Sequence, residues 1–107
     1  MITPEGSPCT TRHINHVAIA VRDIDESLAF YNRVFGLPEV VVEDLEDQGV
    51  RAALIRVGGT QLEFIQPTNA KGGVARFIAK RGEGLHHVCF EVDNLQVTLD
   101  ALDKEDI

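Results

Sequence analysis

Two segments of the chain repeat one pattern at a constant spacing, and this repeat constrains the fold more than any other feature. Each segment has the pattern of a strand followed directly by a helix, and six positions match at an offset of 71 residues without a gap. The matched pairs are His16 and His87, Val17 and Val88, Ile19 and Phe90, Val21 and Val92, Ile24 and Leu95, and Leu28 and Leu99. One register across strand and helix predicts two copies of one structural unit. Two unrelated units of similar pattern are the competing interpretation.

The first copy predicts the element order β-α-β-β-β. Residues 14–21 are rich in β-branched side chains and form the first strand. Asp23, with Glu26 three residues later, resembles a capping box that starts a helix, and Gly36 ends that helix. The apolar stripe of this helix is formed by Ile24, Leu28, Tyr31 and Phe35. Three strands follow at about 39–45, 50–57 and 60–66, separated by the turn sequences Asp47-Gln48-Gly49 and Gly58-Gly59.

The second copy has room for its strand and helix, but not for three further strands before residue 107. We therefore predict an α+β fold of paired βαβββ modules in which the second module is incomplete. The expected divisions are a flexible N-terminal tail at 1–12, a first module at 13–67, a linker with a short helix at 68–84, and the start of the second module at 85–107. Either the chain is part of a longer polypeptide, or it completes itself with another chain.

The charge balance excludes some classes of partner. Lys and Arg number 10 against 17 Asp and Glu, which gives a formal net charge of −7. This balance argues against nucleic acid and against an anionic membrane surface as partners. No apolar run approaches the roughly 20 residues of a spanning helix, and the N-terminus has no signal-peptide pattern. With only Cys9 and Cys89, a disulfide framework is not expected, and we predict a cytoplasmic protein.

Strand alternation brings together residues that can bind a metal ion. His16, Ala18 and Ala20 share one face of the first strand, away from the side that packs under the helix. The repeat places His87 on the equivalent face, and Glu63 alternates outward from the buried side chains of its own strand. Two imidazoles and a carboxylate suit Zn, Co, Ni, Mn or Fe. The offset of 71 places the equivalent of Glu63 at position 134, where a pseudo-twofold site would have its fourth ligand.

Other histidines have simpler interpretations. A histidine on a strand is often a hydrogen-bonded structural residue, and an outward glutamate is often merely solvated. His86 is expected to alternate away from the metal-binding face and to be structural. His13 is expected to be an exposed residue at the flank of its strand.

Three segments together resemble the vicinal oxygen chelate superfamily (the glyoxalase, bleomycin resistance and dioxygenase proteins), and within it the methylmalonyl-CoA epimerases. They are the strand and helix His16-Val-Ala-Ile-Ala-Val and Ser27-Leu-Ala-Phe-Tyr-Asn-Arg-Val-Phe-Gly-Leu, the turn Asp47-Gln48-Gly49-Val50, and Gly82-Glu83-Gly84-Leu85-His86-His87. The resemblance covers about residues 13–107. The turn, the fourth-strand sequence Glu63-Phe-Ile-Gln-Pro and the Gly-Glu-Gly-Leu-His-His motif are the features most specific to the epimerases.

The resemblance implies a cup-shaped sheet that holds a divalent metal ion, Co, Zn, Ni or Mn. By position, His16, Glu63 and His87 match three ligands of the family. The implied reaction inverts the C2 centre of methylmalonyl-CoA, or a similar 2-substituted acyl-CoA, by proton abstraction and return through a metal-stabilised enolate. One family base, a Glu before the Gln of the turn, corresponds here to the shorter Asp47, with Glu46 one residue earlier.

Two other functions share the same scaffold, because a fold does not determine its chemistry. One is a glyoxalase-type lyase or dioxygenase, and the other is a non-catalytic binder of small molecules. The segment Glu46–Val50 favours the epimerase. A homodimer is expected, because a chain of this length buries a small core.

Overall fold

The computed structural model describes residue 6 and residues 8–107, and it contains one five-stranded sheet with helices on both faces. The elements are β1 (Thr11–Ala20), α1 (Ile24–Phe35), β2 (Glu43–Leu45), the 3-10 helix η1 (Glu46–Gln48), β3 (Val50–Val57), β4 (Thr60–Pro67), α2 (Gly73–Arg81), β5 (Gly84–Val92) and α3 (Leu95–Lys104). The strand order is β2-β3-β4-β1-β5, with β1 parallel to β4 and antiparallel to β5. The predicted α+β class and its glyoxalase-like element order are therefore confirmed.

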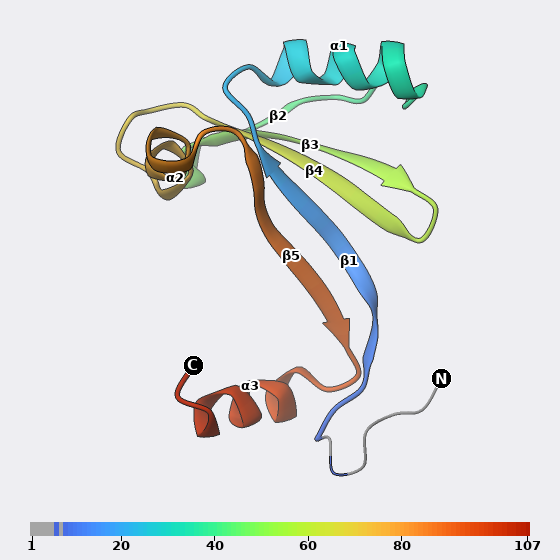
Figure 1. The fold of residues 1–107 in the computed structure, drawn as a ribbon, viewed down its shortest axis with the longest axis vertical. Coiled ribbons are helices and arrows are strands. Elements are labelled where there is room, and N and C mark those ends of the chain that lie inside the picture. Colours follow the sequence, from blue (N-terminus) through green and yellow to red (C-terminus); the bar gives the residue numbers. More distant parts are fainter. Residues whose placement is uncertain (1–5, 7) are drawn as a thin grey trace.

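The pairing of β1 with β5 relates the two repeats by a local twofold axis. Val17 pairs with Val88, which is its own equivalent at the offset of 71, so the axis passes between these two residues. Figure 1 shows the consequence, because α1 and α3 lie at opposite ends of the β1–β5 pair.

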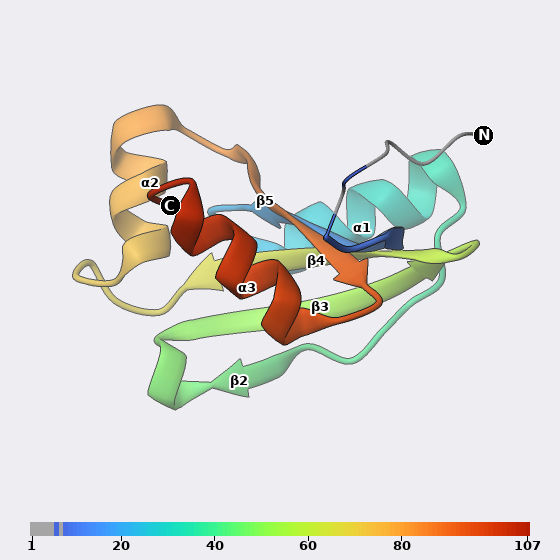
Figure 2. The ribbon, with the colours of Figure 1, turned by 90° about the horizontal axis from the view of Figure 1, so that it is seen from below.

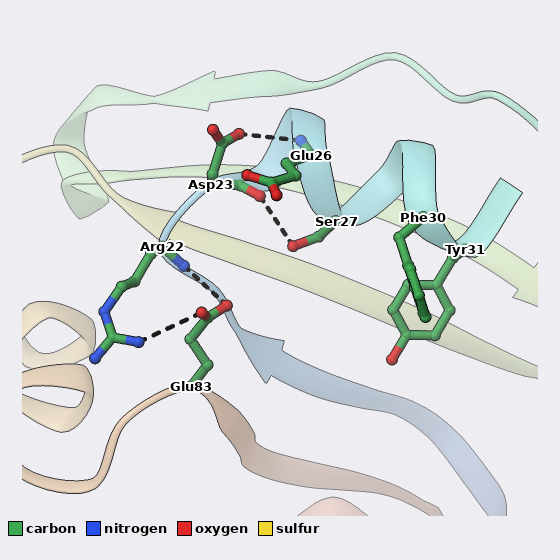
Figure 3. A pocket seen from close by; sticks show the side chains of 7 residues that line it. All are labelled: Arg22, Asp23, Glu26, Ser27, Phe30, Tyr31 and Glu83. Atoms are coloured by element: carbon green, nitrogen blue, oxygen red, sulfur yellow. Dashed lines mark hydrogen bonds and ion pairs between the residues drawn. The ribbon is translucent and has the colours of Figure 1, made fainter. Parts of the chain in front are cut away.

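The two helix starts reproduce each other in atomic detail. The side chain of Asp23 accepts a hydrogen bond from the backbone N–H of Glu26 at 3.0 Å (Figure 3), and Asn94 accepts one from Val97 at 3.0 Å. The hydroxyls of Ser27 and Thr98 donate to the backbone oxygens of these two caps. Each contact in α3 lies 71 residues after its counterpart in α1, as the sequence repeat predicts.

Two apolar clusters pack on opposite faces of the sheet. The cluster under α1 contains Val21, Ile24, Ala53, Ile55 and Phe64. The other cluster contains Ala18, Ala20, Ala52, Ile65 and Ile78, with Val74 and Phe77 of α2 against it. The predicted alternation of β1 is confirmed, but its His16 face is not free of helices, because α2 covers part of it; Figure 2 shows α2 beside the sheet.

Two predicted boundaries differ from the structure. β1 begins at Thr11, inside the predicted tail 1–12, because Thr11 pairs with Val92 and Thr10 is hydrogen-bonded to Asp93. The rest of the tail prediction falls partly on residues 1–5 and 7, which lie outside the described residues. The predicted strand 39–45 is reduced to β2, because Val40 and Val42 pack in the α1 cluster instead of extending the sheet edge.

The apolar stripe of α1 also ends earlier than predicted. Ile24 is fully buried, and Leu28 and Tyr31 pack against the core, whereas Phe35 is 64% exposed. Phe35 lies in the last turn and stacks on Tyr31, with 5.4 Å between the ring centroids.

The second repeat is much less covered than the first. None of the residues of α3, all of which the structure describes, is buried. Leu95 is 66% exposed, whereas its equivalent Ile24 is fully buried. Other exposed apolar side chains of β5 and α3 are Leu85, Val88, Phe90, Leu99 and Leu102. Of the helices that the structure describes, not one has the length and apolar character needed to cross a membrane.

Candidate metal centre

Three neighbouring strands bring the predicted ligands together. In the sheet register, Ala18 of β1 lies beside Glu63 of β4 on one side and beside His87 of β5 on the other. Paired residues of adjacent strands point to the same face of a sheet. His16, two residues before Ala18, points to that face as well. The small side chain of Ala18, which is fully buried, therefore forms the floor between the ligands.

The ligand atoms lie at distances that suit one ion. Nε2 of His16 and Nε2 of His87 are 3.2 Å apart, and each is 3.9 Å from Oε1 of Glu63. One ligand atom from each of the three residues lies within 4.8 Å of the others. Two nitrogens about 2.1 Å from one ion stand roughly 3.0 Å apart at a right angle and roughly 3.4 Å apart at a tetrahedral angle. The N–N distance therefore fits a divalent metal ion, and the two N–O distances of 3.9 Å would fit after a small shift of the Glu63 side chain.

The three candidate ligands are accessible to solvent but partly buried. The side chains of His16 and Glu63 are 23% and 20% exposed, and that of His87 is 43% exposed. A pocket of about 220 Å³ opens beside them, lined by Leu45, Gln48, Val50, Glu63, Ile65, Val74, His86 and His87. Its lining combines apolar walls with these polar groups, as small-molecule sites commonly do.

Each ligand histidine has a hydrogen-bonding partner next to it in the sequence. Nδ1 of His16 lies 2.9 Å from Oδ1 of Asn15, and Nδ1 of His87 lies 2.9 Å from Nδ1 of His86. The predicted placement of His86 away from the site is wrong, because its side chain contacts His87 and lines the same pocket. The repeat makes Asn15 and His86 equivalent positions, but strict alternation gives no sign that either side chain turns toward its neighbour.

The environment of His86 favours its neutral form. Burial lowers the pKa of His86, and the neighbouring His87 lowers it further, while the carboxylate of Glu63 acts in the opposite direction. The ring also packs edge-on against Phe77 of α2, with 4.9 Å between centroids. A neutral imidazole in a fixed ring position can accept a hydrogen bond at one nitrogen.

The predicted bases Glu46 and Asp47 lie on η1 at the edge of the sheet, and both are exposed. Neither is among the residues that line the pocket beside the metal group, whereas their neighbour Gln48 is. Gly49 ends η1 in the left-handed region, at φ 67°, where a Cβ would come within 3.0 Å of the side chain of Asn69. The backbone conformation at Gly49 therefore determines how η1 is placed beside the pocket.

An ion pair also joins the two repeats, just after the end of β1 and just before the start of β5. The guanidinium of Arg22 lies 3.4 Å from Oε1 of Glu83, and the backbone N–H of Arg22 donates to Oε2 of the same carboxylate. Figure 3 shows this pair beside the N-terminus of α1. Glu83 precedes β5 directly, so the contact ties the entry of β5 to the exit of β1.

Comparison with known proteins gives the family. The profile of the Glyoxalase/Bleomycin resistance protein/Dioxygenase superfamily matches residues 15–107. This chain belongs to that superfamily. Its relatives include human mitochondrial methylmalonyl-CoA epimerase, which is 34% identical over 103 residues covering 95% of this chain and 58% of the human protein. The chain thus spans little more than half the length of this glyoxalase-superfamily relative.

Solved structures of related proteins superpose closely on this chain. Methylmalonyl-CoA epimerase from Mycobacterium tuberculosis superposes with a TM-score of 0.79 at 30% identity, over 90% of this chain and 65% of that one. The Streptomyces coelicolor epimerase in complex with 2-nitronate-propionyl-CoA superposes with a TM-score of 0.76 at 32% identity, over 91% and 70% of the two chains. A more distant relative is lactoylglutathione lyase of Schizosaccharomyces pombe, 30% identical over an alignment of 119 positions, gaps included, that covers 92% of this chain and 38% of the lyase.

Proposed function

We propose that this protein is a metal-dependent epimerase that inverts the C2 centre of methylmalonyl-CoA or of a similar 2-substituted acyl-CoA. The observation that carries the proposal is the convergence of His16, Glu63 and His87 from three strands beside an accessible pocket. The similarity to several epimerases over nearly the whole chain supports the choice of this reaction within the superfamily.

In this proposal the three side chains hold a divalent cation, Co, Zn, Ni or Mn. When bound, the cation would supply positive charge that stabilises the negative charge developing on the substrate oxygens as the C2 proton leaves. The carboxylate of Glu63 offsets part of the charge of the ion, and the two imidazoles bind without adding charge. Val50, Ile65 and Val74 exclude water from one side of the pocket.

The base for one face of the substrate is proposed to come from η1. Asp47 is the first candidate and Glu46 the second, because their neighbour Gln48 lines the pocket. Both carboxylates are exposed, so a short displacement of this surface segment would bring one of them to a substrate at the pocket mouth. A carboxylate that takes the C2 proton on one face needs a second group to return it on the other.

Metal binding by the chain itself tests the ligand set. We expect the wild-type chain to bind one equivalent of Co²⁺, measured by calorimetry and by the visible absorption of the bound ion. His87→Ala and Glu63→Gln should lose more than about 100-fold in affinity, since they remove a ligand rather than its support. His13→Ala is the matched control, because His13 is a β1 histidine that contacts Glu91 instead of the metal group. Equal Co²⁺ affinity in all four proteins would rule out this site.

Proton exchange tests the reaction. The polypeptide encoded by the whole reading frame that contains this chain should exchange the C2 proton of methylmalonyl-CoA with deuterium from solvent, as followed by proton NMR. Chelation of the metal and His87→Ala should each stop the exchange. A chelated enzyme that exchanges at the full rate would contradict metal dependence.

A lyase is the second candidate, favoured by the similarity to lactoylglutathione lyase. The same preparation should be assayed for lactoylglutathione formation. Lactoylglutathione formation without C2 exchange of methylmalonyl-CoA would replace the epimerase proposal with the lyase. Stoichiometric binding of small molecules with neither activity would favour a non-catalytic binder.

A further inference from the structure

We infer that Asn15 and His86 are a repeat-related pair of positioning residues, each of which holds the next histidine with its Nε2 facing Glu63. The inference rests on the proposed metal site and assigns a role to two residues outside its ligand set. It follows from the backbone of β1 and β5, the hydrogen bonds of the two rings, and the offset of 71 residues.

Both residues are the extra residue of a β-bulge. On β1, Ile14 pairs with Phe90 and His16 pairs with Cys89, so Asn15 has no opposite residue on β5. On β5, His87 pairs with Ala18 and Leu85 pairs with Ile19, so His86 has no opposite residue on β1. Bulges interrupt the strict alternation of a strand and re-aim side chains, and they are frequent beside active sites.

The bulges explain how neighbouring side chains reach each other. In a regular strand, residues i and i+1 point to opposite faces and their side chains do not meet. Here Oδ1 of Asn15 lies 2.9 Å from Nδ1 of His16, and Nδ1 of His86 lies 2.9 Å from Nδ1 of His87. A bulge residue that contacts the ring of the following histidine therefore occurs twice, once in each repeat, on either side of the twofold axis.

The hydrogen bonds determine which nitrogen of each ring can bind a metal. Oδ1 of Asn15 only accepts, so Nδ1 of His16 carries the proton and its Nε2 has a lone pair. For His87, Nε2 has a lone pair when Nδ1–H donates to Nδ1 of His86, which places the proton of His86 on its own Nε2. The two Nε2 atoms lie 3.2 Å apart and 3.9 Å from Glu63. Without an ion, Nε2–H of His87 donates to Nε2 of His16, because the proton of the His16 ring is on Nδ1. A bound ion would replace that proton, and His86 would then accept from Nδ1–H of His87.

The first test reads the proton positions by nitrogen-15 NMR of the imidazoles. His16 should be protonated at Nδ1 in the metal-free chain, and His87 should become protonated at Nδ1 when Zn²⁺ is added. Asn15→Leu removes the acceptor and should move the proton of His16 toward Nε2, and His86→Phe should make the Nδ1–H of metal-bound His87 exchange faster with solvent. Asn15→Asp keeps an acceptor, and His86→Asn places at one repeat the residue that serves in the other, so both should keep the wild-type proton positions. A merely structural role would not separate these pairs of variants.

The second test measures Co²⁺ affinity in the same variants. Loss of outer support for a metal-binding histidine typically costs about 10-fold to 100-fold in affinity. We expect that loss for Asn15→Leu and His86→Phe, and affinities within about 3-fold of wild type for Asn15→Asp, His86→Asn and the control His13→Ala. Backbone amide spectra identify any variant that has lost the fold. The variants that remain folded still test the inference.

Two results would overturn the inference: a metal-free His16 protonated at Nε2, or Leu and Phe variants that keep the wild-type proton positions and full Co²⁺ affinity. A wild-type chain whose His16 is protonated at Nδ1, in which Asn15→Leu moves that proton, and which binds no Co²⁺ would support the positioning role of Asn15 and contradict the proposed metal site. The two ideas can therefore fail separately.

Discussion

Ala18 is the single residue through which the three candidate ligands are linked. It lies between Glu63 and His87 in the sheet, and its side chain is fully buried against Ala20 and Ala52. Any larger side chain at this position would have to displace one of the two ligands. The methyl group of Ala18 is thus a determinant of the site, although it carries no polar atom.

Replacement of Ala18 by valine should weaken metal binding more than its effect on folding would suggest. Overpacking of a filled core costs about 1–3 kcal/mol, which chemical denaturation measures. Ala20→Val is the matched control, since Ala20 is equally buried but pairs with Ile65 and Gly84 instead of with the ligands. We expect both variants to lose similar stability, and only Ala18→Val to lose at least about 10-fold in Co²⁺ affinity. Equal affinities in the two variants would show that Ala18 is an ordinary core residue.

Single substitutions can also show which of the two carboxylates of η1 is the base. Asp47→Asn should slow deuterium exchange at C2 of methylmalonyl-CoA from one face by about 10²-fold to 10⁴-fold, and it should leave Co²⁺ affinity unchanged. The base would contact the substrate and not the ion, which is why the two readouts should separate. Glu46→Gln is the comparison variant: a larger loss there than in Asp47→Asn would transfer the role to Glu46.

Elements with a local signature could be predicted well from the sequence. The α1 start at Asp23, its left-handed end at Gly36 and the Gly58-Gly59 turn each depend on residues close together in the chain. The proximity of His16, Glu63 and His87 could also be predicted, because alternation and the repeat are both visible in the residues.

The bulges at Asn15 and His86 could not be predicted in this way. A bulge is a property of two paired strands, and the register of β1 against β5 depends on contacts about 70 residues apart. Strict alternation therefore placed His86 on the wrong face. The length of β2 was missed for a similar reason, since Val40 and Val42 make long-range contacts in the core that compete with strand pairing.

The two N-caps offer a test at the level of single helices. Asp23→Ala and Asn94→Ala remove equivalent hydrogen bonds, each of which is typically worth about 1 kcal/mol. We expect Asp23→Ala to lower the global free energy of unfolding by about this amount, because α1 carries the fully buried Ile24. Asn94→Ala should instead increase amide exchange within α3 and leave the global value nearly unchanged, because α3 has no buried residue. Identical global effects would mean that α3 is as tightly coupled to the core as α1.

For the whole molecule, the uncovered second repeat predicts association with a second copy of the chain. Phe90, Leu95 and Leu99 are 61%, 66% and 48% exposed, and apolar side chains exposed together favour contact with another protein surface. Sedimentation velocity should show a dimer at micromolar concentration. Leu99→Glu should shift it toward the monomer, whereas Val41→Glu, at an 82% exposed position outside the second repeat, should not. A monomer over the whole concentration range would contradict the prediction.

The twofold pairing of Val17 with Val88 has a consequence for how the two repeats stay together. His16 and Glu63 come from one repeat and His87 comes from the other, so an ion bound by all three would act as a removable cross-link between the halves of the molecule. An ion at a free concentration 100 times its Kd would add about 2.7 kcal/mol to the stability of the joined state. The amides of β5 should then exchange more slowly as Co²⁺ is added, while those of β2 and β3, which carry none of the three ligands, should change less.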